Sequence, residues 1–431
     1  MSQTVNQPSQ IASLLRRLRE KKLSYWLVAA LILIFAEFSA PLLYKHFRLA
    51  RARASFFQAL LDWGPRPARP RYVKIVLVGN DEYWAGPLAG RRPIKRDYLA
   101  TIVTNLAQKN VHIIALDFDV RLPTPQAFEI PADYRDETQK LIEAIRKAAR
   151  SDKKVILATP ISSAAKGKYH RDADIYQASG LCTSAAGIPS EAAMSNIFCG
   201  YIALPRDDLR IPPPIEMDDG TTMDSFAMAI ARAQAPDSVE RFTPDEQELG
   251  YLDFFTHDRL EKAKAIFSAR DVRLGTLDQS ALDSTIAIVG GGWSRDAINR
   301  GGLVDLHNTP VGPMLGVEMH ANYAEAILDS RVRAGLSERV LVVAELVFGV
   351  LAAIVLGLLS RMWTKLFALC GLAGLAFVVS LLALHIRGVF FDAFIPLMGL
   401  GIHAVLEPYV ERFEHYLKLR QAKSNVLAPH S

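Results

Sequence analysis

The chain has 431 residues, of which 50% are hydrophobic and 22% are charged, and its formal net charge is +5. The basic residues gather near both ends and in short clusters without interleaved aromatic residues, so we expect a membrane surface and not a nucleic acid as partner. The motifs HExxH and GxSxG and paired-cysteine metal spacings are absent, so the sequence does not support a hydrolase, a metalloprotease, a metal site or a cofactor.

The first part of the chain predicts a cytoplasmic tail followed by a membrane span. Residues 1–10 are polar, basic residues cluster between positions 16 and 22, and residues 23–44 are apolar over a length that crosses a bilayer as a helix. A cleaved signal peptide is the alternative, but the apolar stretch is longer than a usual signal core and lacks a convincing cleavage pattern. By the positive-inside rule, the basic cluster places residues 1–22 in the cytoplasm.

Residues 45–338 predict one large domain outside the cytoplasm, long enough to bury a hydrophobic core. Buried strands are expected at residues 72–78, 111–116, 155–158, 249–255 and 285–289, and helices at residues 97–109, 140–149, 224–235 and 316–328. Strands and helices alternate over the first half of the domain. We therefore expect an α/β fold, with a mostly parallel sheet and helices on its faces.

Two cysteines of this domain, Cys182 and Cys199, lie 17 residues apart. In an oxidising compartment they can form a disulfide bond. Two buried free thiols are the alternative, and the sequence leaves both readings open.

Three further apolar segments, at residues 340–360, 366–384 and 389–406, predict transmembrane helices, and residues 407–431 form a short cytoplasmic tail. Buried helices of a soluble domain are the alternative, but the segments are almost continuously apolar and the charges gather in the breaks. Arg361 and Lys365 lie in a break that is cytoplasmic in this topology. We therefore expect a bacterial inner-membrane protein with four spans, both termini in the cytoplasm and the large domain in the periplasm.

Three carboxylates follow predicted strands of the outer domain. Asp81 follows the first strand, Asp117 ends the second and Asp296 follows the strand at residues 285–289. Because open parallel sheets form their ligand crevice at the carboxyl ends of the strands, these side chains could receive a polar or cationic ligand. Helix capping and hydrogen bonding within loops are the alternative.

Two other features have structural interpretations. His320 and Asn322 lie two apart in a predicted helix and diverge by about 200°, so they cannot face one pocket, and we expect His320 to be a packed or capping residue. Gly290, Gly291 and Gly292 predict a tight turn, because the Lys and Ser or Thr of a phosphate loop are absent.

Several motifs resemble the type-two CHASE domain, an extracellular sensory module of cyclases and histidine kinases. They are VKIVLVGNDE (73–82), GRRPIKRDYLA (90–100), HIIALDFDV (112–120), IAIVGG (286–291), NTPVG (308–312) and GVEMHAN (316–322), followed by three apolar segments. Asp305 lies between the last strand and NTPVG, and we count it as a fourth candidate ligand-binding residue. Asp207, Asp208 and Arg210 resemble a central Asp-Gly-x-x-Arg element, although Asp208 replaces the glycine, and Arg92 replaces a tryptophan usual in the second motif.

The resemblance implies a sensor whose ligand is not defined by the motifs. Such domains are fused to a cytoplasmic output module, whereas only about 22 residues follow Tyr409 here. We therefore expect any signal to leave through another polypeptide.

Two carboxylates fall inside predicted spans, where each costs on the order of 3 kcal/mol. Glu37 and Glu345 both lie about 8 to 10 Å below the outer membrane surface at 1.5 Å per residue. They can therefore meet and share a proton or a partner such as Arg387. Separate snorkelling to the interface is the alternative.

The sequence thus predicts a non-enzymatic periplasmic sensor that binds an unknown ligand or protein and signals through its helices to a separate membrane partner. Membrane lipid and a protein partner are the expected contacts, with self-association as a further option. An accessory or scaffold subunit of a larger membrane complex, without any sensing role, is the alternative function.

Overall fold

The computed structural model describes residues 70–122, 131–164, 168–182, 195–204, 211–239, 249–251, 255–283, 285–295, 303–309, 311–334, 338–359 and 361–387, with scattered positions between 26 and 59 and between 391 and 416. The chain divides into two compact units. The first contains residues 1–56, 336–384 and 390–431, and the second contains residues 57–335 and 385–389. Each unit is described by itself.

The second unit is built on a six-stranded sheet in the order β10-β1-β11-β2-β3-β6. Each neighbouring pair of strands is parallel. The strands are β1 (Val73–Val78), β2 (Ile113–Asp117), β3 (Lys154–Thr159), β6 (Ile197–Tyr201), β10 (Ile266–Ser268) and β11 (Ile286–Gly291). The four central strands are rich in Val, Ile, Leu and Ala and are buried along most of their length, as expected for strands covered on both faces. The predicted α/β fold with a mostly parallel sheet is therefore confirmed.

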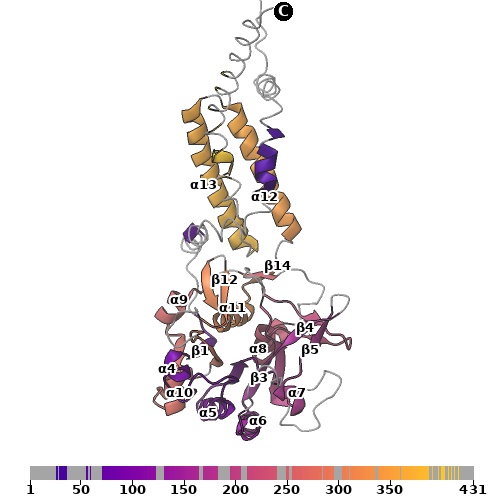
Figure 1. Cartoon of the computed structure of the whole chain (residues 1–431), viewed down its shortest axis with the longest axis vertical. Helices are drawn as coiled ribbons and strands as arrows, with labels where there is room; N and C mark the ends of the chain where they lie inside the picture. The colour runs from indigo at the N-terminus through magenta and orange to yellow at the C-terminus, as the bar shows by residue number, and fades with distance from the viewer. Residues whose placement is uncertain are drawn as a thin grey trace, which may run out of the picture. The chain divides into compact units, whose positions relative to one another are not determined.

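Helices cover both faces of this sheet (Figure 1). On one face lie α5 (Arg96–Ala107), α6 (Tyr134–Arg150) and α10 (Ala269–Leu274). On the other lie α8 (Phe226–Gln234) and α11 (Gly316–Leu328), which also pack against each other. Alternate strand residues such as Val76, Val78 and Leu116 join the core under α5 and α6, which follows from the two-residue period of a strand.

Shorter elements connect these layers. Four two-stranded sheets are antiparallel: β4 (Ile161–Ser163) with β5 (Tyr169–Arg171), β7 (Ile215–Glu216) with β8 (Thr222–Met223), β9 (Leu249–Tyr251) with β14 (Val332–Ala334), and β12 (Leu306–Thr309) with β13 (Gly312–Leu315). The short helices are α4 (Asn80–Tyr83), α7 (Ile175–Ala178), α9 (His257–Lys262), η3 (Pro236–Ser238) and η4 (Gln279–Leu282).

The triple glycine is not the predicted tight turn. Gly290 and Gly291 are the last residues of β11. A Cβ atom at Gly290 would lie 2.6 Å from the Cβ of Val317, and one at Gly291 would lie 2.6 Å from the ring of Trp293. These glycines are therefore explained by the close approach of α11 and of an indole, and not by a turn.

Cys182 and Cys199 form a disulfide bond, with 6.0 Å between their Cα atoms. The bond joins the segment after α7 to β6, the strand at one edge of the main sheet. Of the two alternatives that the sequence left open, the structure contains the disulfide.

The first unit contains α12 (Glu338–Leu358) and α13 (Met362–Arg387). Among the described residues, these are the two helices long and apolar enough to cross a membrane, over Val340–Leu358 and Met362–Ile386. The predicted spans at residues 23–44 and 389–406 lie largely outside the described residues, as does Glu37. Glu345 lies in α12 and is buried within this unit.

Candidate functional site

The carboxyl edge of the sheet brings together two of the four predicted carboxylates. Asp117 is the last residue of β2, and its side chain is 8% exposed. Asp305 lies just before β12 with a φ of 57°, and its charge acts on Asp117. Asp81 is an exposed residue of α4, and its charge acts on Tyr98 of α5. Helix α5 covers the face of the sheet opposite to α11. Asp296 lies outside the described residues.

His320 of α11 completes this edge. Its Nε2 atom lies 3.9 Å from Oδ1 of Asp117, and its ring packs edge-on against Phe226 of α8, with 5.1 Å between the ring centroids. The side chain is 2% exposed, and Nδ1 has no hydrogen-bond partner among the described residues. The sequence predicted a packed histidine but not its contact with Asp117, which lies about 200 residues away in the chain.

The start of α11 holds Asp305 in place. The Gly316 N–H donates to the carbonyl oxygen of Asp305 at 3.0 Å. A Cβ atom at Gly316 would lie 2.0 Å from Oδ2 of Asp305, so a larger residue at position 316 would displace this carboxylate. On its other side, Oδ1 of Asp305 lies 2.9 Å from Nε2 of His307. We call Asp117, His320, Asp305 and His307 the edge cluster.

Burial decides the charges of the edge cluster. It raises the pKa of Asp117 well above its ordinary value, and the neighbouring charge of Asp305 raises this pKa further. Burial also lowers the pKa of His320 to about 4, although Asp305 partly opposes the effect. Within the described ranges, no three His, Cys, Asp or Glu side chains gather closely enough to hold a metal ion. Burial therefore favours the uncharged forms of both Asp117 and His320.

The other polar residues of GVEMHAN have structural roles. Glu318 accepts a hydrogen bond from the Leu315 N–H at 3.2 Å and lies 2.5 Å from Nδ1 of His257. Asn322 binds the backbone of Phe255 through both ends of its amide, accepting from N–H at 2.8 Å and donating to C=O at 3.0 Å. His320 and Asn322 therefore face different neighbours, as their helical spacing predicts.

The motif GRRPIKRDYLA also has a structural role. Both terminal nitrogens of Arg91 donate to the carboxylate of Glu137 in α6 at 2.7 Å. The same carboxylate accepts from the Arg96 N–H at 3.2 Å, and the Arg96 guanidinium stacks on Tyr134 at 4.0 Å from the ring centroid. This motif ties the start of α5 to the start of α6.

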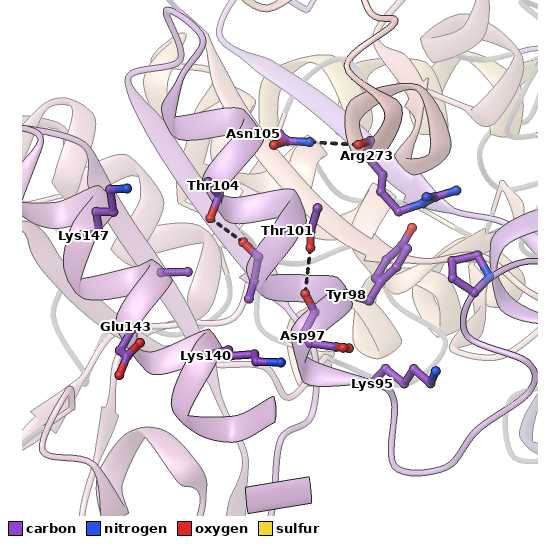
Figure 2. A pocket seen from close by; sticks show the side chains of 13 residues that line it. Lys95, Asp97, Tyr98, Thr101, Thr104, Asn105, Lys140, Glu143, Lys147 and Arg273 are labelled. Carbon is purple, nitrogen blue, oxygen red and sulfur yellow. Dashed lines mark hydrogen bonds between the residues drawn. The ribbon is translucent and has the colours of Figure 1, made fainter. Parts of the chain in front are cut away.

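A polar groove with a volume of about 690 Å³ runs along the seam between α5 and α6 (Figure 2). The hydroxyls of Thr101 and Thr104 on its floor donate to carbonyls of their own helix, and Arg273 at its rim is paired with Glu82 at 2.8 Å. Its other charged residues nearly balance, with Lys95, Lys140 and Lys147 against Asp97 and Glu143. Because its hydroxyls are already bonded within α5 and its charges nearly cancel, the groove is a weaker candidate than the edge cluster.

Comparison with known proteins identifies the family of the chain. The CHASE2 domain family matches residues 27–359, which include the whole second unit except its last few residues and also contain α12. No curated protein and no solved structure matches the chain. The chain therefore belongs to the CHASE2 family of extracellular sensory domains.

Proposed function

We propose that this chain is a sensory protein of the bacterial inner membrane, with its CHASE2 domain in the periplasm and both termini in the cytosol. Family membership supports the sensory role. The Cys182–Cys199 disulfide supports an oxidising compartment, because such bonds are rare in the cytosol. The length and apolar character of α12 and α13 support a membrane anchor.

The observation that carries the proposal is the position of α11 in the domain and in the chain. One end of this helix contributes His320 to the edge cluster. After the other end, β14 is the one element that the structure describes before α12 in the chain. A change in the packing of α11 on the sheet would therefore be transmitted along the chain to α12.

The proposal involves no chemical reaction. An Asp–His pair can act as a general base, but a substrate would have to reach the imidazole, and His320 is 2% exposed. We propose instead that the domain changes conformation, and that its helices pass this change to a separate protein in or at the membrane.

Hydrogen–deuterium exchange on the full-length chain in detergent tests this coupling. Gly290→Ala forces a methyl group against Val317 of α11, whereas Gly86→Ala forces one against the backbone of Asp81, at 2.6 Å from its oxygen and away from α11. We expect only Gly290→Ala to increase exchange in β14 and in the first turn of α12. The milder Val317→Ala, which leaves a cavity under α11, should act in the same direction.

Two results would contradict the sensory proposal. If Gly290→Ala and Val317→Ala leave the exchange in α12 unchanged, then α11 is not coupled to the membrane helices. An equal response to Gly86→Ala would mean general destabilisation. Either result would favour an accessory or scaffold role for the domain.

A further inference from the structure

Glu325 connects α11 to the start of β1. It lies in the last turn of α11, and its side chain is 1% exposed. Oε2 accepts a hydrogen bond from the Val73 N–H at 2.9 Å, and the Tyr72 N–H donates to both carboxylate oxygens at 3.1 and 3.2 Å. Oε1 also accepts from the Arg71 N–H. Three successive backbone donors therefore converge on one buried carboxylate, which lies 252–254 residues away in the chain.

The pairing of β1 explains why an acceptor is needed here. The Ile75 N–H donates to the carbonyl of Ala265, just before β10, and the pairing of β1 with β10 begins at Ile75. The Val73 N–H lies two residues earlier and points to the same edge of the strand. Glu325 therefore takes the place of a neighbouring strand as the acceptor at the start of β1.

The hydrogen bonds of Glu325 are of a strong kind. A bond from N–H to an ionised carboxylate is roughly twice as strong as one between neutral groups. Burial raises the pKa of Glu325, while the N–H groups of residues 71–73 oppose this rise. If α11 moved without these residues, the carboxylate would lose its donors inside the domain, which is unfavourable. A shift of this helix should therefore carry the start of β1 with it.

The Glu325 contact joins the two ends of the domain in the chain. The second unit begins at residue 57, shortly before Arg71, and its main segment ends at residue 335, shortly after Glu325. The first unit contains the chain on both sides of this segment, with the span predicted at residues 23–44 before it and α12 after it. Glu325 thus connects the segment that enters the domain with the helix that leads out of it.

We infer that Glu325 transmits a movement of α11 to the entering segment, so that one signal reaches the chain on both sides of the domain. This inference rests on the proposed sensory function and adds a second route to it. The proposed function needs only the route from α11 through β14 to α12. The Glu325 contact adds a route from α11 through residues 71–73 toward residues 23–44. The membrane partner would then respond to two helices and not to one.

The parallel sheet is an alternative route to the same residues. Val317 is eight residues before Glu325 in α11, about 12 Å along the helix axis at 1.5 Å per residue. It packs against Gly290 of β11, which pairs with β1 from Val73 to Val78. A displacement at Val317 can therefore reach the start of β1 through the sheet or through Glu325, and only the second route needs the carboxylate.

Double electron–electron resonance on the full-length chain in detergent separates the two routes. Cys370 is replaced by serine, the Cys182–Cys199 bond is kept, and spin labels are attached to two pairs of new cysteines. One pair is Arg71→Cys with Asp136→Cys, and the other is Ser330→Cys with Asp136→Cys, all at exposed positions. The label on α6 is the reference, so the pairs report the entering segment and the segment after α11. Val317→Ala should shift or broaden both distance distributions.

Glu325→Gln should remove the response of the 71/136 pair to Val317→Ala and keep the response of the 330/136 pair. The matched control is Glu318→Gln, because Glu318 is equally buried on the same helix but bonds to Leu315 and His257. This control should keep both responses. If Glu325→Gln fails to fold, Glu325→Asp replaces it, because it keeps the charge but withdraws the carboxylate by one methylene. A 71/136 response that survives the Glu325 variant would assign the transmission to the sheet and overturn the inference.

Failure of the inference and failure of the proposed function are distinguishable. If Val317→Ala raises exchange in α12 but leaves the 71/136 distribution unchanged, α11 is coupled to α12 and the second route is absent. If exchange in α12 does not respond, the sensory proposal itself is wrong.

Discussion

Asn322→Ala tests whether the closing motif stabilises the domain through backbone hydrogen bonds. The side chain is 1% exposed and satisfies both the N–H and the C=O of Phe255, which is itself 3% exposed. Truncation leaves two buried backbone groups without partners, at about 1–3 kcal/mol each. We therefore expect the free energy of unfolding of the domain to fall by about 2–6 kcal/mol.

Pulse proteolysis of the detergent-solubilised chain in urea measures this loss for the domain. With a denaturant slope of about 3 kcal/mol per molar, the urea midpoint should fall by about 0.7–2 M. Asn105→Ala is the matched control, because its amide donates to the carbonyls of Val272 and Arg273 at 3.1 and 3.0 Å in a half-exposed position, where water can replace it. If Asn322→Ala lowers the midpoint no more than this control does, the reasoning about buried backbone groups is wrong.

Three further predictions use the same assay. Burial raises the pKa of Asp117, so ionisation of this carboxyl group destabilises the folded domain as the pH rises above the ordinary pKa of an aspartate. The stability of Asp117→Asn relative to the wild type should therefore increase with rising pH. A stability difference that is constant with pH would contradict this sign. Glu137→Gln breaks the paired hydrogen bonds of Arg91 and should cost about 2–4 kcal/mol, and a loss below about 1 kcal/mol would indicate an ordinary surface pair. Replacing Cys182 and Cys199 by alanine should lower the free energy of unfolding by about 3 kcal/mol, and a reductant should then no longer change the stability of the domain. If a reductant does not destabilise the wild type, the disulfide bond is absent.

The sequence predicts the elements that local pattern determines. The buried runs at β1, β2 and β11 form strands, because only a doubly covered parallel sheet needs such continuous apolar segments. Helix α11 begins and ends at the predicted residues, Gly316 and Leu328. These features depend on neighbours within a few residues of one another.

Features that depend on distant neighbours are not predictable in this way. The strand β10 has three residues, and its pairing beside β1 follows from a contact across about 190 residues of chain. Gly290 and Gly291 resemble turn residues until Val317 and Trp293 are placed against them. His320 likewise becomes a candidate site residue only when the fold brings it to Asp117.

The sequence does indicate where the site lies. The rule that ligands meet a parallel sheet at the carboxyl ends of its strands selected Asp117, and the family resemblance added Asp305, which the fold brings close to Asp117. The same rule also selected Asp81, which follows β1 but turns to the face covered by α5. The rule thus identifies the edge of the sheet, whereas the face depends on how each loop leaves its strand.

The side of the membrane on which the domain lies is the central claim, and cysteine accessibility tests it most directly. In a chain with Cys370 replaced by serine, Asp136→Cys places a thiol on exposed α6, and Thr364→Cys places one at the exposed start of α13. The account predicts that a membrane-impermeant maleimide labels position 136 in intact spheroplasts, and position 364 only after permeabilisation. Labelling of position 364 but not of position 136 in intact spheroplasts would place the domain in the cytosol and contradict the account.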